Sequence, residues 1–254
     1  MPLSELARRL ELPRLEWYDA VDSTQDCARA IAQENGEEWT TVVADHQRQG
    51  RGQQGRSWEG EAGHGLAFSI LLRPGSIEGL AVLPIRIGLA IVRTLARYIA
   101  PPSRLMVKWP NDLMIDRPGW AGKVGGVLCE GQVRGDECTA IIGVGINVFP
   151  FAIEDESFNE PIAFLADHLA SKAERAPLFE LIVAGLRKGL RWSDSELGYG
   201  EILEYERYDW LRGHRIIAPV VGTAWGITRT GALAVQTSKG GWETVLTGRV
   251  RRGR

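Results

Sequence analysis

The sequence contains little sulfur and little lysine: 3 cysteines, 3 methionines and 5 lysines in 254 residues. Cys27, Cys129 and Cys138 show neither a CxxC motif nor paired metal-ligand spacing, and their odd number argues against a disulfide framework. This excludes the disulfide-rich secreted class and indicates a reducing cytoplasm. Cys129 lies on an apolar stretch, so we interpret it as a core residue and not as a nucleophile.

The chain also lacks a strong net charge and an uninterrupted apolar run. Its formal net charge is -2 and its sequence pI is about 6.1, so it has no overall electrostatic attraction for nucleic acid or acidic membranes. The apolar residues 80–99 are interrupted by Pro84, Arg86, Arg93 and Arg97, unlike a membrane span. Nothing at the N-terminus resembles a signal peptide. With 44% apolar residues, we expect a soluble, folded protein without a nucleic-acid or membrane partner.

Hydrophobic spacing predicts the first helices. Leucines at roughly helical spacing predict a helix over residues 3–12, and "LEWY" predicts a short strand before a second helix that begins at "DSTQ". Ser23 or Thr24 is expected to cap this second helix, with Asp26 as a weak capping-box partner. Apolar residues at every third or fourth position predict a long helix over residues 80–99 that packs on a sheet.

The remaining patterns predict a sheet, more helices and a small β-rich domain. Strands are predicted at residues 40–45, 66–73, 104–109, 123–131 and 139–148. Turn signals stand at "WPND" and "DRPG", and residues 160–208 are predicted mostly helical, including "IAFLADHLA" and "FELIVAGLRKGL". After residue 210, glycine turns about every ten residues predict a small β-barrel. We therefore predict an α+β fold: a mixed β-sheet flanked by helices in residues 1–209, and the barrel in residues 210–254.

One glycine-rich loop carries a local positive charge. The stretch "GRGQQGRSW", residues 50–58, places Arg51 and Arg56 among three glycines. Because glycine has no Cβ, such a loop brings backbone amides and guanidinium groups close to an anion such as phosphate. A surface loop with solvated arginines is the alternative, and the pattern alone leaves both open. The loop is neither a P-loop nor a Rossmann fingerprint, because GxxxxGK[ST] and a helix-opening GxGxxG are absent.

Polar residues at predicted strand ends are further candidates for a site. In "VKWPNDLMI", Lys108, Asn111 and Asp112 either face a ligand or form a turn with their own backbone. Lys123 precedes "VGGVLCE" and either donates to a phosphate or carbonyl oxygen or lies solvated on the surface. Asn147 ends "GVGIN", where its amide either contacts a base edge or caps a turn.

Six stretches in this order resemble one family. "DSTQ", "QxxGRGxxGRxW", "GLAFSILLR", "VKWPND", "KVGGVLCE" and "GVGINV" resemble the catalytic domain of biotin protein ligase, and the β-rich tail resembles its small SH3-like C-terminal domain. The resemblance spans nearly the whole chain and implies the class II synthetase-like fold of biotin and lipoate ligases. It also implies a cytoplasmic enzyme that uses ATP and Mg²⁺ to convert biotin to biotinoyl-5′-AMP. The biotinoyl group then passes to a lysine of a biotin carboxyl carrier protein, as in acetyl-CoA carboxylase.

The resemblance implies roles residue by residue. Ser23, Thr24 and Gln47 match positions that hydrogen-bond the biotin ureido group, and the strand over residues 65–69 matches the wall against its rings and chain. The implied biotin-binding residues are Ser23, Thr24, Gln25, Gln47, Gly50, Arg51 and Lys123. The implied ATP- and adenylate-binding residues are Arg51, Gly52, Gln53, Arg56, Trp58, Asn111, Asp112, Lys123 and Asn147. Arg51 and Lys123 are the implied catalytic residues, and the metal ligands stay unassigned.

The implied mechanism is electrostatic. A carboxylate and a triphosphate repel each other and must approach within about 3 to 3.5 Å. Arg51 and Lys123, together with Mg²⁺, offset this repulsion and the charge that grows on the phosphate. The glycines let a loop that is disordered in the empty enzyme fold over the adenylate and exclude water from the anhydride.

The loop departs from the family pattern at one position. The usual sequence is "GRGRxGRxW", whereas Gln53 stands here where an arginine is expected. A neutral amide donates a hydrogen bond but lacks the charge and the bidentate fork of arginine. We therefore expect this protein to hold biotinoyl-5′-AMP less tightly than its arginine-bearing relatives.

Three further expectations follow from the resemblance. Some family members carry an N-terminal winged helix, but only 21 residues precede Asp22 here, so we expect a ligase without direct repressor activity. Family dimers form edge to edge through the catalytic sheet, so we expect a homodimer. A lipoate ligase and a non-catalytic biotin or nucleotide sensor are the rival functions, and the presence of both Arg51 and Lys123 disfavours the sensor.

Overall fold

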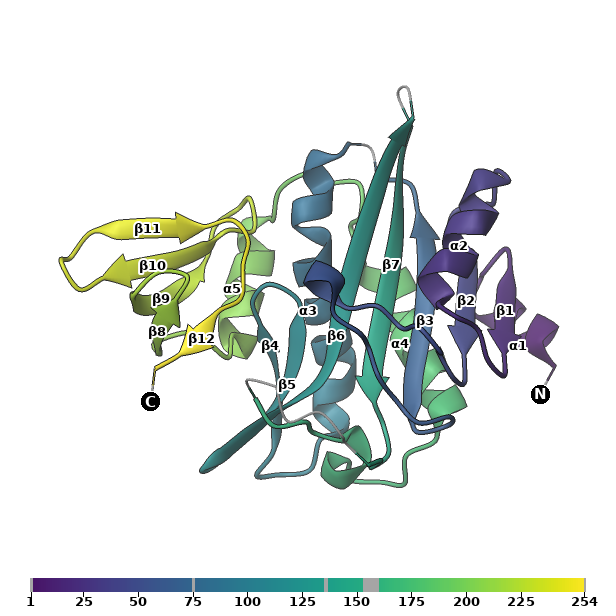
Figure 1. Cartoon of the computed structure of the whole chain (residues 1–254), viewed down its shortest axis with the longest axis horizontal. Helices are drawn as coiled ribbons and strands as arrows, with labels where there is room; N and C mark the ends of the chain where they lie inside the picture. The colour runs from purple at the N-terminus through teal and green to yellow at the C-terminus, as the bar shows by residue number, and fades with distance from the viewer. Residues whose placement is uncertain (1, 75, 135–136, 153–159, 254) are drawn as a thin grey trace.

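Two β-sheets organise the chain (Figure 1). The computed structural model describes residues 2–74, 76–134, 137–152 and 160–253. The larger sheet has seven strands in the order β1-β2-β3-β7-β6-β5-β4, and the smaller has five in the order β11-β10-β9-β8-β12. β1 and β2 are parallel and the other ladders of the large sheet are antiparallel, which confirms the predicted α+β fold with a mixed sheet.

The elements have the following bounds. The large sheet contains β1 (Leu15–Tyr18), β2 (Thr41–Ala44), β3 (Gly65–Leu72), β4 (Arg104–Lys108), β5 (Asp112–Arg117), β6 (Trp120–Arg134) and β7 (Glu137–Asn147). The small sheet contains β8 (Arg215–Ala218), β9 (Gly222–Ile227), β10 (Leu233–Thr237), β11 (Trp242–Val245) and β12 (Arg251–Arg252). The α-helices are α1 (Leu3–Arg9), α2 (Thr24–Gln33), α3 (Leu83–Leu95), α4 (Arg175–Gly189) and α5 (Tyr199–Tyr208). The 3-10 turns are η1 (Gln53–Gly55), η2 (Glu78–Ala81), η3 (Ala96–Tyr98) and η4 (Leu165–His168).

The two faces of the large sheet are covered differently. α3 and α4 pack on one face in the main core, with Ile87, Val107 and Phe179 fully buried. α2 covers only part of the other face, through a separate small cluster of Ala28, Ile31, Val42, Leu71 and Ile141. The loop of residues 50–58 crosses the remainder of that face in front of β6 and β7 (Figure 1). The partly covered face is therefore where a ligand has room.

The prediction of a helix at "IAFLADHLA" was wrong. The Lys123 amide donates to the Pro161 carbonyl at 2.7 Å, and the Ala163 amide donates to the Lys123 carbonyl at 2.8 Å. These bonds hold the chain extended around Ile162, beside β6, and only η4 within this stretch is helical. Pairing with a strand far back in the sequence therefore overrides the local helical pattern.

Two local predictions around the site were wrong, and one strand was missed. Ser23 occupies the N-cap position of α2, but its hydroxyl makes no capping bond; instead the Thr24 amide donates to Gln47 Oε1 at 2.9 Å. Asp26 forms no capping box and instead pairs with arginines. β5 was not predicted. After the "WPND" turn the chain returns directly as a strand, in which Asp112 pairs with Lys108 of β4.

The C-terminal strands form a small antiparallel sheet that is open. β11 and β12 lie at its two edges, and no ladder joins them within residues 210–253. The β-rich unit was thus predicted, but its closure into a barrel is not seen in the described residues. A bulge between Ala234 and Val235 bends the β9–β10 ladder without closing the sheet.

The two sheets share one hydrophobic core. Ile216, Leu233 and Val250 belong to the same buried cluster as the residues of α3. Trp109, only 1% exposed, donates its indole N–H to the Gly231 carbonyl at 2.8 Å. The Trp210 amide donates to the Val107 carbonyl at 2.9 Å. The small sheet is therefore fixed against the edge of the large sheet that carries β4.

Asp209 lies at this junction as a buried carboxyl group. Burial raises its pKa from 3.8 to about 6, although hydrogen bonds such as that from the Leu211 amide, at 2.9 Å, act in the opposite direction. Because the folded-state pKa is raised, ionisation of Asp209 opposes folding. The unfavourable contribution is absent below about pH 4, develops as the pH rises towards 6, and is complete above it.

We expect Asp209→Asn to raise the free energy of unfolding above pH 7 by about 2 to 3 kcal/mol, since a pKa difference of about two units corresponds to that amount. Near pH 4 the gain should vanish, because the wild-type carboxyl is then neutral in both states. Urea unfolding of both proteins between pH 4 and 8 measures the difference. A difference that does not change across this range would contradict the assignment.

Candidate functional site

One cavity of about 610 Å³ lies over the partly covered face of the large sheet. It brings together segments that are far apart in the sequence: α2, the 50–58 loop, the β4–β5 turn, β6 and β7. Twelve of the fourteen predicted site residues line it: Thr24, Gln25, Gln47, Arg51, Gly52, Gln53, Arg56, Trp58, Asn111, Asp112, Lys123 and Asn147. The other two predicted residues, Ser23 and Gly50, do not line it.

Glycines on two neighbouring strands make the floor of the cavity. Gly126 of β6 pairs with Gly145 of β7, and both line the cavity together with Gly143. A Cβ added to Gly145 would lie 2.4 Å from Trp58 Cε2, so the indole rests directly on the backbone. The absence of side chains along this row is what leaves space between the sheet and the loop.

The end of the cavity next to α2 carries neutral polar groups. The Thr24 hydroxyl donates to Gln47 Oε1 at 3.0 Å and shares a 2.8 Å hydrogen bond with the Ser69 hydroxyl. Gln25 Nε2 donates to Glu130 Oε2 at 2.9 Å. Gln25 Oε1 is buried, with no hydrogen-bond partner in the part of the chain that the structure describes. This end offers both donors and acceptors without a net charge, as a neutral hydrogen-bonding ligand requires.

Ser23 and Gly50 lie outside the cavity lining, and of the two Gly50 has a described contact with the loop. Ser23 is buried, and its hydroxyl has no partner among the described residues. Gly50 accepts a hydrogen bond from the Trp58 amide at 2.8 Å, and a Cβ on Gly50 would lie 2.3 Å from the Trp58 carbonyl oxygen. Gly50 is therefore required for the close approach of the two ends of the loop.

The 50–58 loop is held in one hydrogen-bonded conformation. The Gly52 amide donates to the Arg56 carbonyl at 2.8 Å, and Arg56 Nε donates to the Gln53 carbonyl at 3.2 Å. η1 forms the tip, where Gln54 adopts a left-handed φ of 57° and Gly55 one of 73°. That the loop is disordered without ligand stays a prediction.

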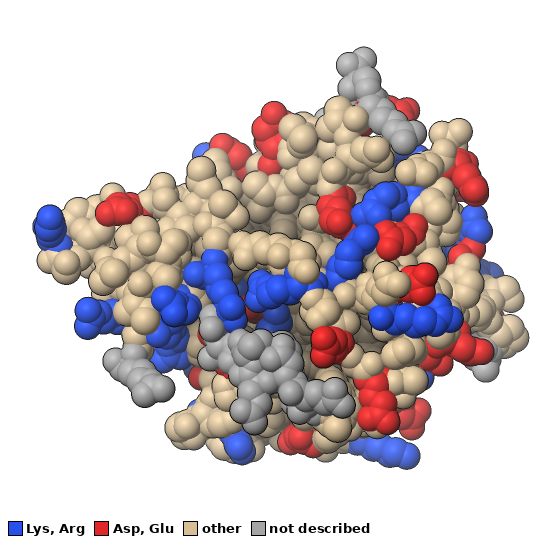
Figure 2. Space-filling view, in the orientation of Figure 1, with Lys and Arg blue, Asp and Glu red and all other residues tan. Residues whose placement is uncertain are grey.

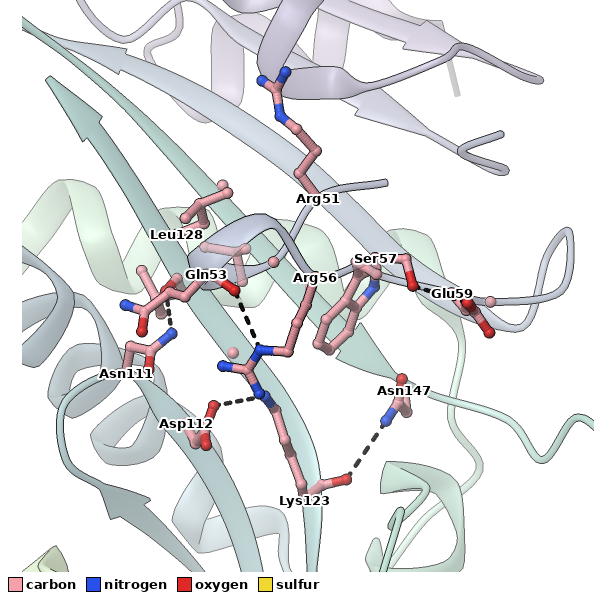
Figure 3. Close-up of a pocket in the computed structure, with 18 of the residues that line it drawn as sticks. Arg51, Gln53, Arg56, Ser57, Glu59, Asn111, Asp112, Lys123, Leu128 and Asn147 are labelled. Atoms are coloured by element: carbon pink, nitrogen blue, oxygen red, sulfur yellow. Dashed lines mark hydrogen bonds and ion pairs between the residues drawn. The ribbon is translucent and has the colours of Figure 1, made fainter. Parts of the chain in front are cut away.

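The far end of the cavity is charged (Figure 3). Lys123 Nζ pairs with Asp112 Oδ1 at 2.6 Å and lies 5.7 Å from the centre of the Trp58 ring. Asn111 Nδ2 donates to the Val127 carbonyl at 2.7 Å, which ties the β4–β5 turn to β6. The Asn147 amide reaches the Lys123 carbonyl only at 3.5 Å, so it is weakly held.

The structure does not bring the charged groups of Arg51 and Lys123 together. Arg51 lines the cavity, but in Figure 3 its guanidinium points away from Lys123 and towards α2. There it pairs with Asp26 at 2.8 Å and with Glu130 at 3.2 Å. Sequence reasoning implied that both cations meet one anion, whereas the structure holds them apart.

Several lining residues escaped sequence reasoning. Lys108 was noted there but not assigned to the site; its buried Nζ pairs with Glu160 at 2.6 Å. Arg249 and Val250 of the C-terminal sheet region also line the cavity, and so does Phe151. Lys108 carried a local signal, since it stands in "VKWPND" beside Asn111 and Asp112. Phe151, Arg249 and Val250 carry none, because they reach the site only through the packing of distant segments.

The described residues offer no preformed metal cage and no helix that could span a membrane. Among them no group of three or more His, Cys, Asp or Glu side chains stands close enough to hold a metal ion. No helix in the same described set is long and apolar enough to cross a membrane. Asp112 is the cavity carboxylate that lies beside the predicted catalytic lysine.

Comparison with known proteins agrees with this geometry. The profile of the biotin/lipoate A/B protein ligase family matches residues 17–147, just over half of the chain. The bifunctional ligase/repressor BirA of Bacillus subtilis is 29% identical over 247 residues, 89% of this chain and 70% of the relative. The biotin–[acetyl-CoA-carboxylase] ligase of Paracoccus denitrificans is 36% identical over 116 residues, 45% of each protein.

A solved structure is similar over nearly the full length. The biotin protein ligase from Aquifex aeolicus in complex with biotin and ATP superposes with a TM-score of 0.77 at 27% identity, over 95% of this chain and 100% of that one. The similarity includes both the large sheet and the C-terminal strands. The chain therefore belongs to the biotin/lipoate A/B protein ligase family.

Proposed function

We propose that this protein is a biotin protein ligase that activates biotin with ATP and transfers it to a lysine of a biotin carboxyl carrier protein. The observation that carries the proposal is one cavity with a neutral hydrogen-bonding end, a charged end and a glycine–arginine loop across it. The similarity to a biotin ligase solved with biotin and ATP supports the assignment of the two ends. The reaction occurs in two steps.

The neutral end suits the ureido ring of biotin. Thr24 and Gln47 present a hydroxyl and an amide side by side, and the free acceptor Gln25 Oε1 completes a set that matches the donor and acceptor edge of a urea. Apolar lining from Phe68 and Leu128 suits the rings and chain. The biotin carboxylate then lies towards Lys123.

The charged end suits ATP. Trp58 offers a flat aromatic face for adenine, and Asn111, Asp112 and Asn147 lie where the nucleotide enters. Arg56 and the exposed Arg249 are further cations around the cavity, available to the phosphates. This arrangement brings the biotin carboxylate against the α-phosphate.

In the first step, a carboxylate oxygen of biotin bonds to the α-phosphorus of ATP, and the bond to pyrophosphate breaks. Lys123, half-buried beside Asp112, donates hydrogen bonds to the carboxylate and the α-phosphate and stabilises the charge that grows between them. The loop excludes water from the resulting biotinoyl-5′-AMP. In the second step the amine of the carrier lysine attacks the biotinoyl carbonyl, an amide bond forms and AMP leaves.

Mg²⁺ fits this site as a companion of ATP. Protein-bound Mg²⁺ commonly uses one or two carboxylates together with water and substrate phosphates, so a complete cage of side chains is not required. Asp112, on the cavity wall, is the residue we assign to this role. Bound Mg²⁺ neutralises phosphate charge and so favours pyrophosphate departure.

The remaining assignments concern organisation and location. We propose a domain boundary near residue 210 and a cytoplasmic location, where ATP is abundant and the free thiols stay reduced. We also propose a homodimer. β1 is its contact edge, because the β4 edge already meets the chain at Asp209 and Trp210.

The test is to incubate the protein with ATP, Mg²⁺, biotin and a purified carrier domain, and to measure the mass of the carrier. We expect one biotinoyl group per carrier, and none on a carrier whose acceptor lysine is replaced by arginine. A parallel reaction with lipoate distinguishes a lipoate ligase. Binding of biotin without any carrier modification would show a sensor and overturn the proposal.

Gln53 provides a test within the loop. We expect Gln53→Arg to slow the release of biotinoyl-5′-AMP by roughly tenfold or more, because a hydrogen bond to a charged group is worth about 1.5 to 3 kcal/mol. Biotinylation of an unrelated protein in the absence of carrier should also fall, because less biotinoyl-5′-AMP is released. Gln54→Arg, which adds the same charge one position along, is the matched control. Equal release from wild type and Gln53→Arg would show that another arginine already compensates.

A further inference from the structure

Arg51 lines the cavity and belongs to a compact group of four charged side chains whose other members do not line it. We call this group the Arg51 cluster: Asp26, Arg29, Arg51 and Glu130. Arg51 Nη1 lies 2.8 Å from Asp26 Oδ1, and Arg51 Nη2 lies 3.2 Å from Glu130 Oε2. Arg29 pairs with the same two carboxylates, at 2.5 Å and 2.8 Å. The cluster joins the loop, α2 and β6 and is neutral as a whole.

This position conflicts with the role that the family resemblance implies for Arg51, which is contact with the biotin carboxylate and the phosphate. Lys123 lies at the charged end of the cavity, paired with Asp112, and the Arg51 guanidinium points away from it (Figure 3). To meet an anion held by Lys123, Arg51 must leave Asp26 and Glu130. The two carboxylates therefore compete with the ligand for the same guanidinium.

The strength of this competition is modest. All four side chains of the cluster are between 32% and 48% exposed, and exposed ion pairs change an equilibrium by a factor of only about 1.5 to 5. Arg29 keeps both carboxylates partly neutralised when Arg51 departs, so the departure leaves no unpaired buried charge. Ion pairs of this strength shift the equilibrium between paired and free Arg51, but they leave a measurable fraction of molecules in which Arg51 is free.

We propose that Asp26 is a positioning residue that holds Arg51 in the cluster and so limits its contact with the biotin carboxylate and the phosphate. The inference rests on the proposed function. We assign this positioning role to Asp26 and not to Glu130, because Glu130 also accepts a hydrogen bond from Gln25, which lines the cavity. The described contacts of the Asp26 carboxylate are with the two arginines alone.

The test compares Asp26→Asn with Asp22→Asn, a matched control close by. Asp22 is also an exposed aspartate paired with an arginine, but its partner is Arg48, at 2.9 Å. Modification by phenylglyoxal in the absence of any ligand, followed by peptide mass analysis, reports how often each guanidinium is free. Asp26→Asn should make Arg51 react about two- to fivefold faster, while Asp22→Asn should accelerate Arg48 and leave Arg51 unchanged.

Biotin affinity, measured by calorimetry, gives the second readout. Asp26→Asn should tighten biotin binding by the same two- to fivefold factor, because one equilibrium governs both the free guanidinium and the binding-competent state. In an Arg51→Gln background the effect of Asp26→Asn on affinity should disappear. A general structural effect of the substitution would persist in that background.

The outcomes separate the inference from the proposed function. Unchanged Arg51 reactivity, or weaker biotin binding in Asp26→Asn, overturns the positioning role. If Asp26→Asn speeds Arg51 modification but neither the wild type nor the variant binds biotin, the positioning role of Asp26 is supported and the proposed function is overturned. Faster modification with tighter biotin binding supports both.

Discussion

Replacing Lys123 by alanine should slow biotinoyl-5′-AMP formation by about a hundred- to thousandfold while the protein still folds and still binds biotin. Lys123 lies at the charged end of the cavity, where its Nζ pairs with Asp112 Oδ1 at 2.6 Å. Losing one charged donor to a transition state costs about 3 to 4 kcal/mol, which corresponds to that change in rate. Single-turnover formation of the adenylate is the measurement.

Two control variants test whether the slower rate is specific to the Lys123 charge. Lys239→Ala removes an exposed lysine from the β10–β11 turn and should leave the rate unchanged. Lys123→Ala also leaves the Asp112 carboxylate without its partner near incoming phosphates, so Lys123→Ala combined with Asp112→Asn separates lost attraction from added repulsion. A near-normal single-turnover rate in Lys123→Ala would refute the catalytic role.

Features set by short stretches of sequence were predictable. The leucine spacing of α1, the β-branched run of β2 and the apolar periodicity of α3 each follow from neighbours along the chain. The 50–58 loop is predictable for the same reason, since its glycines and arginines are contiguous. The sequence motifs also pointed to the cavity, because residues from all six line it, while their roles stay predictions.

Features set by distant pairing were not predictable. Ile162 is extended because it lies beside Lys123, and its own neighbours favoured a helix. At the start of α2 the Thr24 amide donates to Gln47, whereas local rules predicted a cap from the side chain of Ser23 or Thr24. In both cases a partner far away in the sequence supplies the hydrogen bond, which a single-sequence pattern does not contain.

The orientation of Arg51 shows the same limit within the site itself. Its residue type and place in the loop predicted contact with an anion, and it does contact anions. Those anions are Asp26 and Glu130, which reach it from α2 and from β6. The face of the molecule shown in Figure 2 carries both basic and acidic side chains, many of them close to one another. Sequence reasoning identified the cation, but the fold decides which carboxylate it meets.

Trp109 should give the largest effect on stability. Trp109→Ala is expected to lower the free energy of unfolding by about 3 to 5 kcal/mol, because it removes a buried aromatic side chain and its 2.8 Å hydrogen bond to Gly231. The residue stands in the "KWPND" turn beside the site and contacts the C-terminal region, so the same change should loosen the small sheet from the cavity edge. Trp242→Ala, at a tryptophan that is 57% exposed, should cost less than about 0.5 kcal/mol. Urea unfolding of both variants and the wild type measures these differences. If Trp109→Ala were as stable as the wild type, Trp109 would not join the two sheets, and the C-terminal strands would reach the site by other contacts.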